Sequence, residues 1–363
     1  MTTANRETLS RAANLVRPAL ATKEYIPVYT HIHFSGGRAT ACNDVSALSV
    51  ACANPVECCV PGELLIRALS GFGGAEVSMQ MKDSTLLLKS GRSNVKLPTL
   101  PASDFLFDLP NPNEGEAVSL GRSVVKAIER CLLSVGTDNA HPAQMGVTLE
   151  SEKGLAVLYS TDNYTISRCS TEAKLKLPGD APIILPRFFC EQLIGLAKAY
   201  PEATMDLVMY PGALVVEFVD VREGPDAPAA AILFTKTPVD LEPMDFPRIV
   251  NKHVDLADIK KTLAVIPDAF DGALNRALLV LGSELQKKTK ITAGDGLLIM
   301  SSRSSLGESD DSMKFDMDDH NFEVDPVLLT RGAKACALMG FTNRVTIMAD
   351  TECNFIHIIA HRA

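Results

Sequence analysis

The stretch Val60-Pro61-Gly62-Glu63-Leu64-Leu65 has the features of a helix start, and its pattern occurs twice more along the chain. The second copy is Leu185-Pro186-Arg187-Phe188-Phe189 and the third is Val324-Asp325-Pro326-Val327-Leu328-Leu329. In each copy a proline stands where the first turn of a helix tolerates a missing N–H, and apolar residues follow at helical spacing. A strand hairpin is expected after each copy. The copies lie more than a hundred residues apart, which is too long for a solenoid unit and predicts three similar domains.

The chain length agrees with this division, because 363 residues are about two to three times the size of a domain with a single core. We expect domains at residues 1–118, 119–250 and 251–363. Each is predicted to be an α+β domain with two helices and about eight strands. The predicted helices cover residues 6–23, 62–70, 121–135, 186–200, 254–265 and 325–339.

The composition is that of a packed protein of a reducing compartment. No run of 18 apolar residues is present, and the N-terminus lacks the apolar segment of a signal peptide. These features predict a cytoplasmic protein that does not enter a membrane. The nine cysteines form no C-x-x-C pair, so we expect buried free thiols rather than disulfides or a zinc site.

Charge is divided unequally between the predicted helices and the remainder of the chain. The six helices carry 14 Lys and Arg against 7 Asp and Glu, a net +7, whereas the whole chain carries −9. For any single helix a solvated face is the simpler interpretation, but an excess over related helices suits sequence-independent contact with DNA phosphates. The absence of Trp favours duplex over single-stranded DNA. The candidates for facing DNA are Arg6, Arg11, Arg67, Arg122, Lys126, Arg130, Lys198, Lys260, Arg331 and Lys334.

Sequence motifs of catalysis are absent. The chain has no phosphate-binding loop, no H-E-x-x-H, no G-x-S-x-G and no G-x-G-x-x-G. His31 and His33 alternate along one predicted strand without a third metal ligand nearby in sequence. We therefore expect no enzyme activity, no metal and no cofactor. An enzyme that uses one of the nine thiols is the alternative.

The segments Ser90-Gly91-Arg92-Ser93 and Thr99-Leu100-Pro101-Ala102-Ser103-Asp104-Phe105 carry a family resemblance. They resemble the S-G-R-S…T-L-P-A-x-D-F pattern of the bacterial DNA polymerase III beta subunit, the sliding clamp. Shorter matches follow in the same order over essentially the whole chain: Ile26-Pro27, Asn43-Asp44, Thr161-Asp162, Pro186-Arg187 and Phe246-Pro247.

The resemblance implies the DNA-clamp fold and a ring of two chains joined head to tail. Helices would line the hole and sheets would form the outer wall. The protein would then be a processivity factor whose partners are double-stranded DNA, a replicative DNA polymerase, a clamp loader and a second copy of itself. The resemblance places Lys23 at a DNA-contacting position, and it places Phe105 and Ile266 at the interface between copies.

The resemblance also implies a groove between the second and third domains that binds peptides of partner proteins. In place of the family's T-D-G-H-R-L this chain has Thr161-Asp162-Asn163-Tyr164-Thr165-Ile166, and Arg248 directly follows Phe246-Pro247. Of the family's C-terminal M-P-M-R-L only Arg362 is kept. These departures leave the peptide preference open and would suit a phage-encoded or otherwise specialised replisome. The alternative within this fold is an interaction scaffold that does not close into a ring. The expected groove residues are Thr161, Asn163, Tyr164, Thr165, Ile166, Phe246, Pro247, Arg248 and Arg362.

Overall fold

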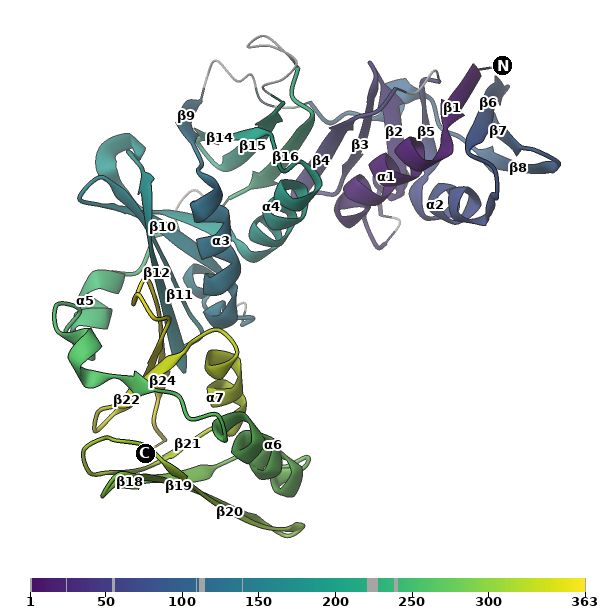
Figure 1. Cartoon of the computed structure of the whole chain (residues 1–363). Helices are drawn as coiled ribbons and strands as arrows, with labels where there is room; N and C mark the ends of the chain where they lie inside the picture. The colour runs from purple at the N-terminus through teal and green to yellow at the C-terminus, as the bar shows by residue number, and fades with distance from the viewer. Residues whose placement is uncertain are drawn as a thin grey trace. The chain divides into compact units, whose positions relative to one another are not determined.

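The computed structural model describes residues 2–23, 25–53, 56–108, 110, 115–138, 140–220, 228–237 and 241–362. Within these ranges the same series of elements occurs three times, as strand, helix, four strands, helix and three strands (Figure 1). Each repeat therefore has two helices and eight strands, and the predicted α+β fold class is confirmed. None of the helices described is both long and apolar enough to cross a membrane.

The bounds of the elements are as follows. Repeat 1 comprises β1 (Thr2–Asn5), α1 (Arg6–Val16), β2 (His31–Ser35), β3 (Arg38–Cys42), β4 (Ser46–Ala51), β5 (Cys58–Pro61), α2 (Gly62–Gly71), β6 (Glu76–Lys82), β7 (Thr85–Ser90) and β8 (Ser93–Pro98). Repeat 2 comprises β9 (Glu116–Ser119), α3 (Arg122–Cys131), β10 (Gly146–Glu152), β11 (Leu155–Thr161), β12 (Thr165–Lys174), β13 (Ile183–Pro186), α4 (Arg187–Ala199), β14 (Thr204–Tyr210), β15 (Ala213–Val219) and β16 (Ala231–Lys236). Repeat 3 comprises β17 (Ala264–Val265), α6 (Phe270–Leu281), β18 (Thr289–Gly294), β19 (Leu297–Ser304), β20 (Gly307–Lys314), β21 (His320–Val324), α7 (Pro326–Ala333), β22 (Leu338–Phe341), β23 (Val345–Ala349) and β24 (Phe355–Ala360), and it is preceded by α5 (Phe246–Asn251).

Local sequence explains where the helices start and stop. The Asn5 side chain caps α1 by accepting from the Thr8 N–H at 3.0 Å, and Pro18 lies in the 3-10 turn that follows the helix. Pro326 is the first residue of α7, whereas Pro61 and Pro186 each stand directly before α2 and α4. The three prolines thus mark three helix starts, as predicted.

The helix predicted at 254–265 is wrong. That segment forms turns and a 3-10 helix, η9 (Ile259–Thr262), and the Asp255 carboxylate accepts the Ala257 N–H at 3.0 Å, a local bond that competes with a helix. The first helix of repeat 3 is α6 instead. Its buried positions recur at helical spacing: Phe270, Ala273, Leu274, Ala277 and Leu281.

The chain forms two compact units. Unit 1 contains Met1–Val125 and Glu191–Asp240, and unit 2 contains Lys126–Cys190 and Leu241–Ala363. Each unit has one four-stranded and one eight-stranded antiparallel sheet. The strand orders are β1-β6-β7-β8 and β5-β2-β3-β4-β16-β15-β14-β9 in unit 1, and β20-β19-β18-β21 and β13-β10-β11-β12-β24-β23-β22-β17 in unit 2. Because strands of two repeats share each larger sheet, the units do not follow the repeats, and the predicted domain limits stay a prediction.

Two strand pairs join the repeats. In unit 1, β4 pairs with β16, with buried Leu48 opposite buried Leu233. In unit 2, β12 pairs with β24, with Ser167 opposite His357. Alternate residues of β24 face opposite sides of this sheet: Ile356 and Ile358 pack in one core with α5, whereas α7 lies against the other side (Figure 1).

Candidate functional site

Two neighbouring cavities of unit 2 share the side chain of Tyr164, which is 68% exposed. We refer to them together as the Tyr164 groove. The larger, of about 740 Å³, lies between η5 (Leu132–Ser134), the β11–β12 turn and the helices α4 and α7, and it is lined by Leu132, Leu133, Val135, Gly136, Thr137, Asp138, His141, Gln144, Asp162, Asn163, Tyr164, Arg187 and Arg331. The smaller, of about 560 Å³, is lined by Tyr164, Leu285, Gln286, Lys288, Asp325, Leu328, Ala360, His361 and Arg362.

The β11–β12 turn holds Tyr164 in this position. The Asp162 carboxylate accepts the backbone N–H groups of Tyr164 at 3.1 Å and of Thr165 at 2.7 Å. The Thr161 hydroxyl donates to the Thr165 carbonyl and accepts the Asn163 N–H. Asn163 has a φ of 70°, which asparagine adopts more readily than most residues. The short polar side chains therefore stabilise the turn, and Tyr164 is directed outwards.

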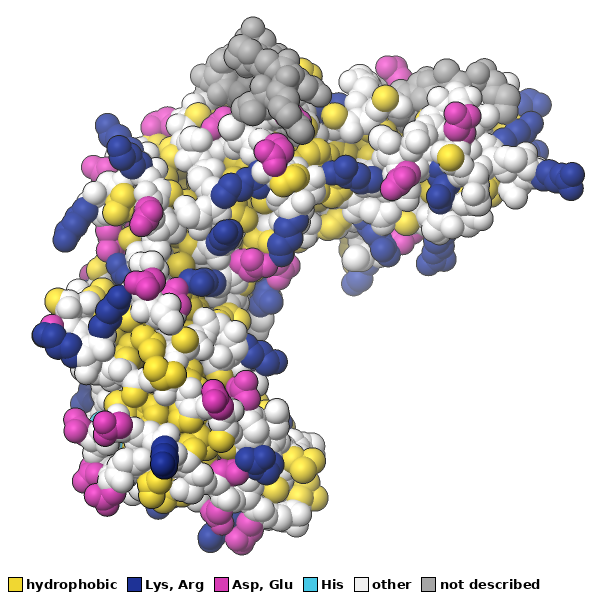
Figure 2. All heavy atoms as spheres, in the orientation of Figure 1, with side chains coloured by type: hydrophobic (Ala, Val, Ile, Leu, Met, Phe, Trp, Pro, Cys, Tyr) yellow, Lys and Arg dark blue, Asp and Glu magenta, His cyan; other side chains and the backbone are white. Residues whose placement is uncertain are grey.

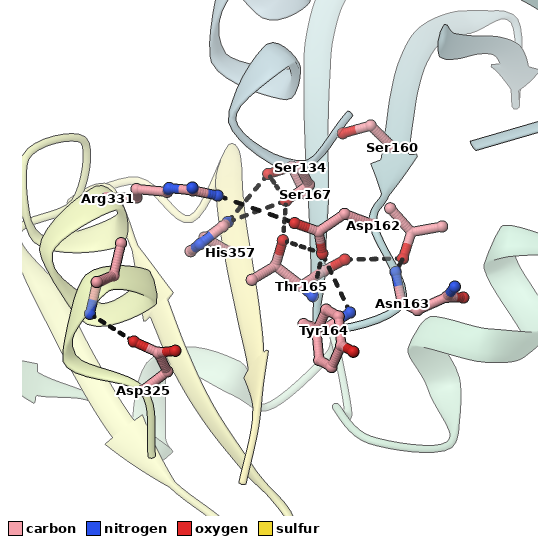
Figure 3. A network of polar contacts seen from close by, with 12 residues as sticks. Ser134, Ser160, Asp162, Asn163, Tyr164, Thr165, Ser167, Asp325, Arg331 and His357 are labelled. Carbon is pink, nitrogen blue, oxygen red and sulfur yellow. Dashed lines mark hydrogen bonds and ion pairs between the residues drawn. The ribbon is translucent and has the colours of Figure 1, made fainter. Parts of the chain in front are cut away.

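A buried polar network lies beneath the turn and joins repeats 2 and 3 (Figure 3). The Ser134 and Ser167 hydroxyls are 2.8 Å apart, and Ser167 is 3.0 Å from Nδ1 of His357. The Thr165 hydroxyl lies 2.9 Å from both Ser134 and the Asp162 carboxylate. His357 is fully buried, and burial, together with the nearby Arg331 guanidinium, lowers the pKa of His357 to about 4. The imidazole is consequently neutral in the folded protein at neutral pH.

The buried histidine makes stability depend on pH. The pKa of His357 is below the ordinary value of about 6.5 only in the folded state, so between these two values the unfolded chain binds the additional proton. Stability is therefore complete above pH 6.5 and is lost as the pH falls towards 4. We expect His357 to contribute a loss of about 2 kcal/mol between pH 7.5 and pH 5, at about 1.4 kcal/mol per pH unit. Urea unfolding at the two pH values measures it.

His357→Asn removes this titration and should give a smaller loss than the wild type. His361, whose pKa burial also lowers to about 4, titrates in both proteins, so the difference between them isolates His357. An equal loss in the wild type and His357→Asn would contradict the prediction.

The expected groove residues are divided among three places. Asn163, Tyr164 and Arg362 line the cavities, and Thr161 and Thr165 are buried within the turn. The remaining four do not line either of these two cavities: Ile166, Phe246, Pro247 and Arg248.

Phe246 is 1% exposed, and its ring stacks on Tyr159 with centroids 5.2 Å apart. It lies in the core beneath α5, on the opposite side of the sheet from α7. Three apolar residues that line the larger cavity were not predicted from the sequence: Leu132, Leu133 and Val135. These residues directly follow α3, and their apolar character alone does not distinguish a cavity floor from a core.

In unit 1, four of the basic candidates for DNA contact are exposed and two are partly buried. The exposed side chains are those of Arg11, Lys23, Arg67 and Lys198. The partly buried Arg6 donates to a carbonyl of α2. Arg122 donates to the carbonyl of Ala197 at the end of α4 and to the carbonyls of Tyr200 and Ala203 just beyond it, at 2.6 to 2.7 Å, and so caps that helix.

In unit 2, three of the basic candidates for DNA contact make ion pairs. Arg130 pairs with Asp350 at 2.6 Å, and Lys260, which lies on η9 rather than on an α-helix, pairs with Glu352 at 3.3 Å. Arg331 lines the Tyr164 groove and pairs with Asp162 at 3.9 Å. Lys126 and Lys334 are exposed.

The basic excess of the α-helices remains after the correction of the third repeat. The α-helices described contain eleven Lys and Arg against five Asp and Glu. Positive charge is not confined to them, because Figure 2 shows Lys and Arg side chains over α3 and α4 and also over the sheet of β6 to β8. The α-helices therefore carry an excess of Lys and Arg, but these residues are not restricted to the helices.

The two residues expected at the interface between copies are packed against cores of their own chain, and the core that contains Phe105 includes Val208 and Phe234 of repeat 2. Phe105 is 9% exposed and stacks on His33 with ring centroids 4.5 Å apart, and Ile266 packs against the core of repeat 3. Their neighbours are the exposed apolar residues: Leu106 is 87% exposed and Val265 is 72% exposed. The exposed apolar side chains thus lie one residue away from each of the two positions predicted for the interface.

The thiols lack the environment of a nucleophile. All nine are free. Burial raises the pKa of Cys42, Cys59 and Cys336 to about 12, and a reactive cysteine needs the opposite shift. Among the residues described, no group of three or more His, Cys, Asp or Glu side chains is arranged to hold a metal ion.

Comparison with known proteins gives a consistent result, although no protein-family model matches the chain. The beta sliding clamp of Proteus mirabilis is 27% identical over 229 residues, which cover 62% of this chain and 56% of that protein. The chain thus aligns with little more than half the length of this relative. The beta sliding clamp of Caulobacter vibrioides is 22% identical over 338 residues, which cover 89% of this chain and 86% of that protein.

Solved structures with the same fold match almost the whole chain. The DNA polymerase III beta subunit of Thermotoga maritima has a TM-score of 0.84 at 15% identity and covers 99% of this chain and 98% of its own. A sliding clamp of Pseudomonas aeruginosa bound to griselimycin also has a TM-score of 0.84, at 18% identity and with the same coverage. At these identities the structural likeness establishes the fold alone.

Proposed function

Because the chain is a divergent member of the beta sliding clamp family, we propose that two copies close head to tail around duplex DNA and hold a replicative polymerase on it. A beta sliding clamp is a processivity factor for DNA polymerase III and not an enzyme. Its contacts with DNA would be independent of sequence, and a clamp loader would open the ring in the cytoplasm. The observation that carries the proposal is that repeats 1 and 3 each leave one edge strand unpaired, although the corresponding strands elsewhere pair between neighbouring repeats.

The repeats have identical sheet topology, which predicts the partner of each free edge. In repeat 1 the strands β5-β2-β3-β4 end at β4, which pairs with β16, the last strand of repeat 2. In the same way β12, the corresponding strand of repeat 2, pairs with β24, the last strand of repeat 3. By this rule β20 of repeat 3 should pair with β8 of repeat 1. Both are edge strands within the residues described, so a second copy is the natural partner.

The charges of the two edges support such pairing. β8 carries the exposed Lys96 and is preceded by the exposed Arg92, whereas β20 carries the exposed Glu308 and Asp310. Edge strands of opposite charge attract one another and do not pair with themselves. Two β20–β8 contacts would close two chains into a ring with no free edge at these positions.

Retention on DNA tests the topological mechanism. After loading onto a nicked circular duplex, the protein should remain bound in high salt and should leave within seconds once the circle is cut. A closed ring can leave a linear duplex only at its ends, whereas phosphate contacts weaken equally on both substrates. Equal loss from circular and linear DNA would reject the ring. A monomeric mass at micromolar concentration would favour the interaction scaffold.

Lys126 gives a test of the DNA-facing helices. Its side chain is exposed on α3, so Lys126→Gln should weaken binding to any duplex and lower the salt dependence by about one ion per copy, without loss of stability. Titration at a series of salt concentrations measures the slope. The exposed Lys174 at the end of β12 is the control, and Lys174→Gln should keep the wild-type slope. Equal slopes in the wild type and Lys126→Gln would place α3 away from DNA.

We further propose that the Tyr164 groove takes the peptides by which the polymerase and the clamp loader attach. It has apolar lining residues, an exposed aromatic side chain and two cavities that share Tyr164, the features of a site for an extended segment. The groove lies where repeats 2 and 3 share one sheet, so its walls are fixed by the β12–β24 pair and by the network around His357.

A further inference from the structure

Glu150 is a buried carboxyl group without a partner. It lies on β10 and is 7% exposed, which makes it the one buried carboxyl group among the residues described. Its side chain makes no hydrogen bond and no ion pair within that part of the chain. A carboxylate that loses its water and gains no donor is strongly disfavoured, so this position favours the neutral, protonated acid.

The Glu150 side chain lies on the face of the sheet against which α5 packs. In the β10–β11 pair Glu150 is opposite Val157, and residues directly opposite each other in an antiparallel pair project from the same face. Val157 belongs to the core that also contains Phe246 and Val250 of α5. The carboxyl group is therefore buried on the side of the sheet that this helix covers.

The charged groups around Glu150 do not supply it with a counter-charge of its own. Two further acids face it: Glu152, on the same face two residues along β10, and Asp245, which caps α5. The cation of this group, Arg168 of β12, is bonded to the Glu152 carboxylate at 3.1 Å and to the Tyr159 hydroxyl at 3.2 Å. Tyr159 donates to Glu152 in turn. Burial, and then repulsion by Glu152 and Asp245, raises the pKa of Glu150 to about 7, although Arg168 opposes the shift.

We propose that a proton on Glu150 regulates the packing of α5: the neutral acid lets the helix pack closely against the sheet, and ionisation of Glu150 weakens that contact. α5 is the one α-helix described between β16, the last strand of repeat 2, and β17, the first strand of repeat 3. The proton thus controls how firmly the connection between these repeats is held. Because α5 and β10 belong to the same compact unit, the effect requires neither DNA nor a second copy of the chain.

The direction of the pH dependence follows from the two states of α5. With α5 packed, the pKa of Glu150 is about 7; with α5 open, the carboxyl group meets water and its pKa returns to the ordinary value of about 4.5. The packed state therefore binds the additional proton between these values, so packing is firmest below pH 4.5 and weakens as the pH rises towards 7. The equilibrium constant for opening should rise about tenfold between about pH 6 and pH 8. His357 acts in the opposite direction, because its neutral form stabilises the fold at higher pH.

Hydrogen exchange of the full chain measures this opening. The amides of residues 246–254, in α5 and just after it, are followed by mass spectrometry at the two pH values, with each rate corrected for the intrinsic pH dependence of exchange. The wild type should show the rise of about tenfold, whereas Glu150→Gln, which cannot ionise, should change by less than about twofold. Glu172→Gln removes an exposed acid from β12 of the same sheet and should keep the wild-type rise.

A titration of the wild type tests the same group without a variant, so it stays decisive if Glu150→Gln does not fold. Carbon-detected NMR of the Glu150 carboxyl, assigned through its own side-chain carbons, should give a midpoint near pH 7. A midpoint below about pH 5.5, within the range of ordinary glutamates, would overturn the proposal. Exchange of residues 246–254 that does not depend on pH, or a rise that persists in a folded Glu150→Gln, would overturn it as well.

Discussion

Phe246→Ala should destabilise unit 2 by about 3 to 5 kcal/mol, the cost of emptying a buried phenylalanine site. Phe246 is 1% exposed and stacks on Tyr159, and the same core contains Val250, Ile356 and Ile358. Phe246 is the first residue of the short helix α5, whose start is capped by the Asp245 carboxylate through the Arg248 N–H. The loss is a large fraction of the stability of a typical domain, so the midpoint of urea unfolding should fall clearly.

Tyr164→Ala is the matched control, because Tyr164 is also a large aromatic residue but is 68% exposed. We expect a change in stability within about 0.5 kcal/mol, together with weaker binding of groove peptides. The two variants thus separate the two roles that sequence similarity assigned jointly to these residues. A Phe246→Ala protein with unchanged stability and weaker peptide binding would place Phe246 in the groove.

Sequence patterns predict the fold well because the same order of strands and helices recurs in three repeats. The prolines at 61, 186 and 326 mark the same point of each repeat, and a local rule about missing N–H groups is enough to find them. The first helix of repeat 3, α6, was not predicted because no proline or capping side chain stands at its start. Its N-cap residue is Ala269, which makes no side-chain hydrogen bond. Its end at Gly282, with a φ of 49°, is the clearer signal.

The site is less predictable than the fold because it depends on contacts distant in sequence. Asn163 and Tyr164 were identified within a hairpin, whose geometry is local, and the structure places both at the groove. Arg122 has the sequence context of a solvated helix face, yet it caps a helix more than sixty residues away. Arg130 likewise forms an ion pair with Asp350, a residue distant in the sequence. An alternation of charged and apolar residues identifies the outer face of a helix but not the partner that lies there.

Ser312→Pro should convert the proposed dimer into monomers at micromolar concentration. Ser304 and Gly307 flank the two-residue turn between β19 and β20, and residues in that position exchange hydrogen bonds. Hydrogen-bonded and non-hydrogen-bonded positions alternate along an antiparallel pair. The backbone groups of Ser309, Asp311 and Met313 therefore bond to β19, whereas the N–H of Ser312 points towards the free edge. Proline removes that donor and leaves an acceptor of the partner's β8 unpaired, at a cost of about 1 to 3 kcal/mol per interface.

Both interfaces of the ring carry the change, so the expected result is a dissociation constant at least about thirty times higher and loss of retention on nicked circular DNA. Ser312→Ala keeps the N–H and should remain dimeric, so sedimentation of the two variants isolates the backbone donor from the side chain. The fold of the monomer should survive, because edge strands tolerate proline where the N–H is not used within the sheet. A dimer of Ser312→Pro as stable as the wild type would show that copies associate elsewhere than at β20, and the pairing rule drawn from the repeats would then not extend beyond the chain.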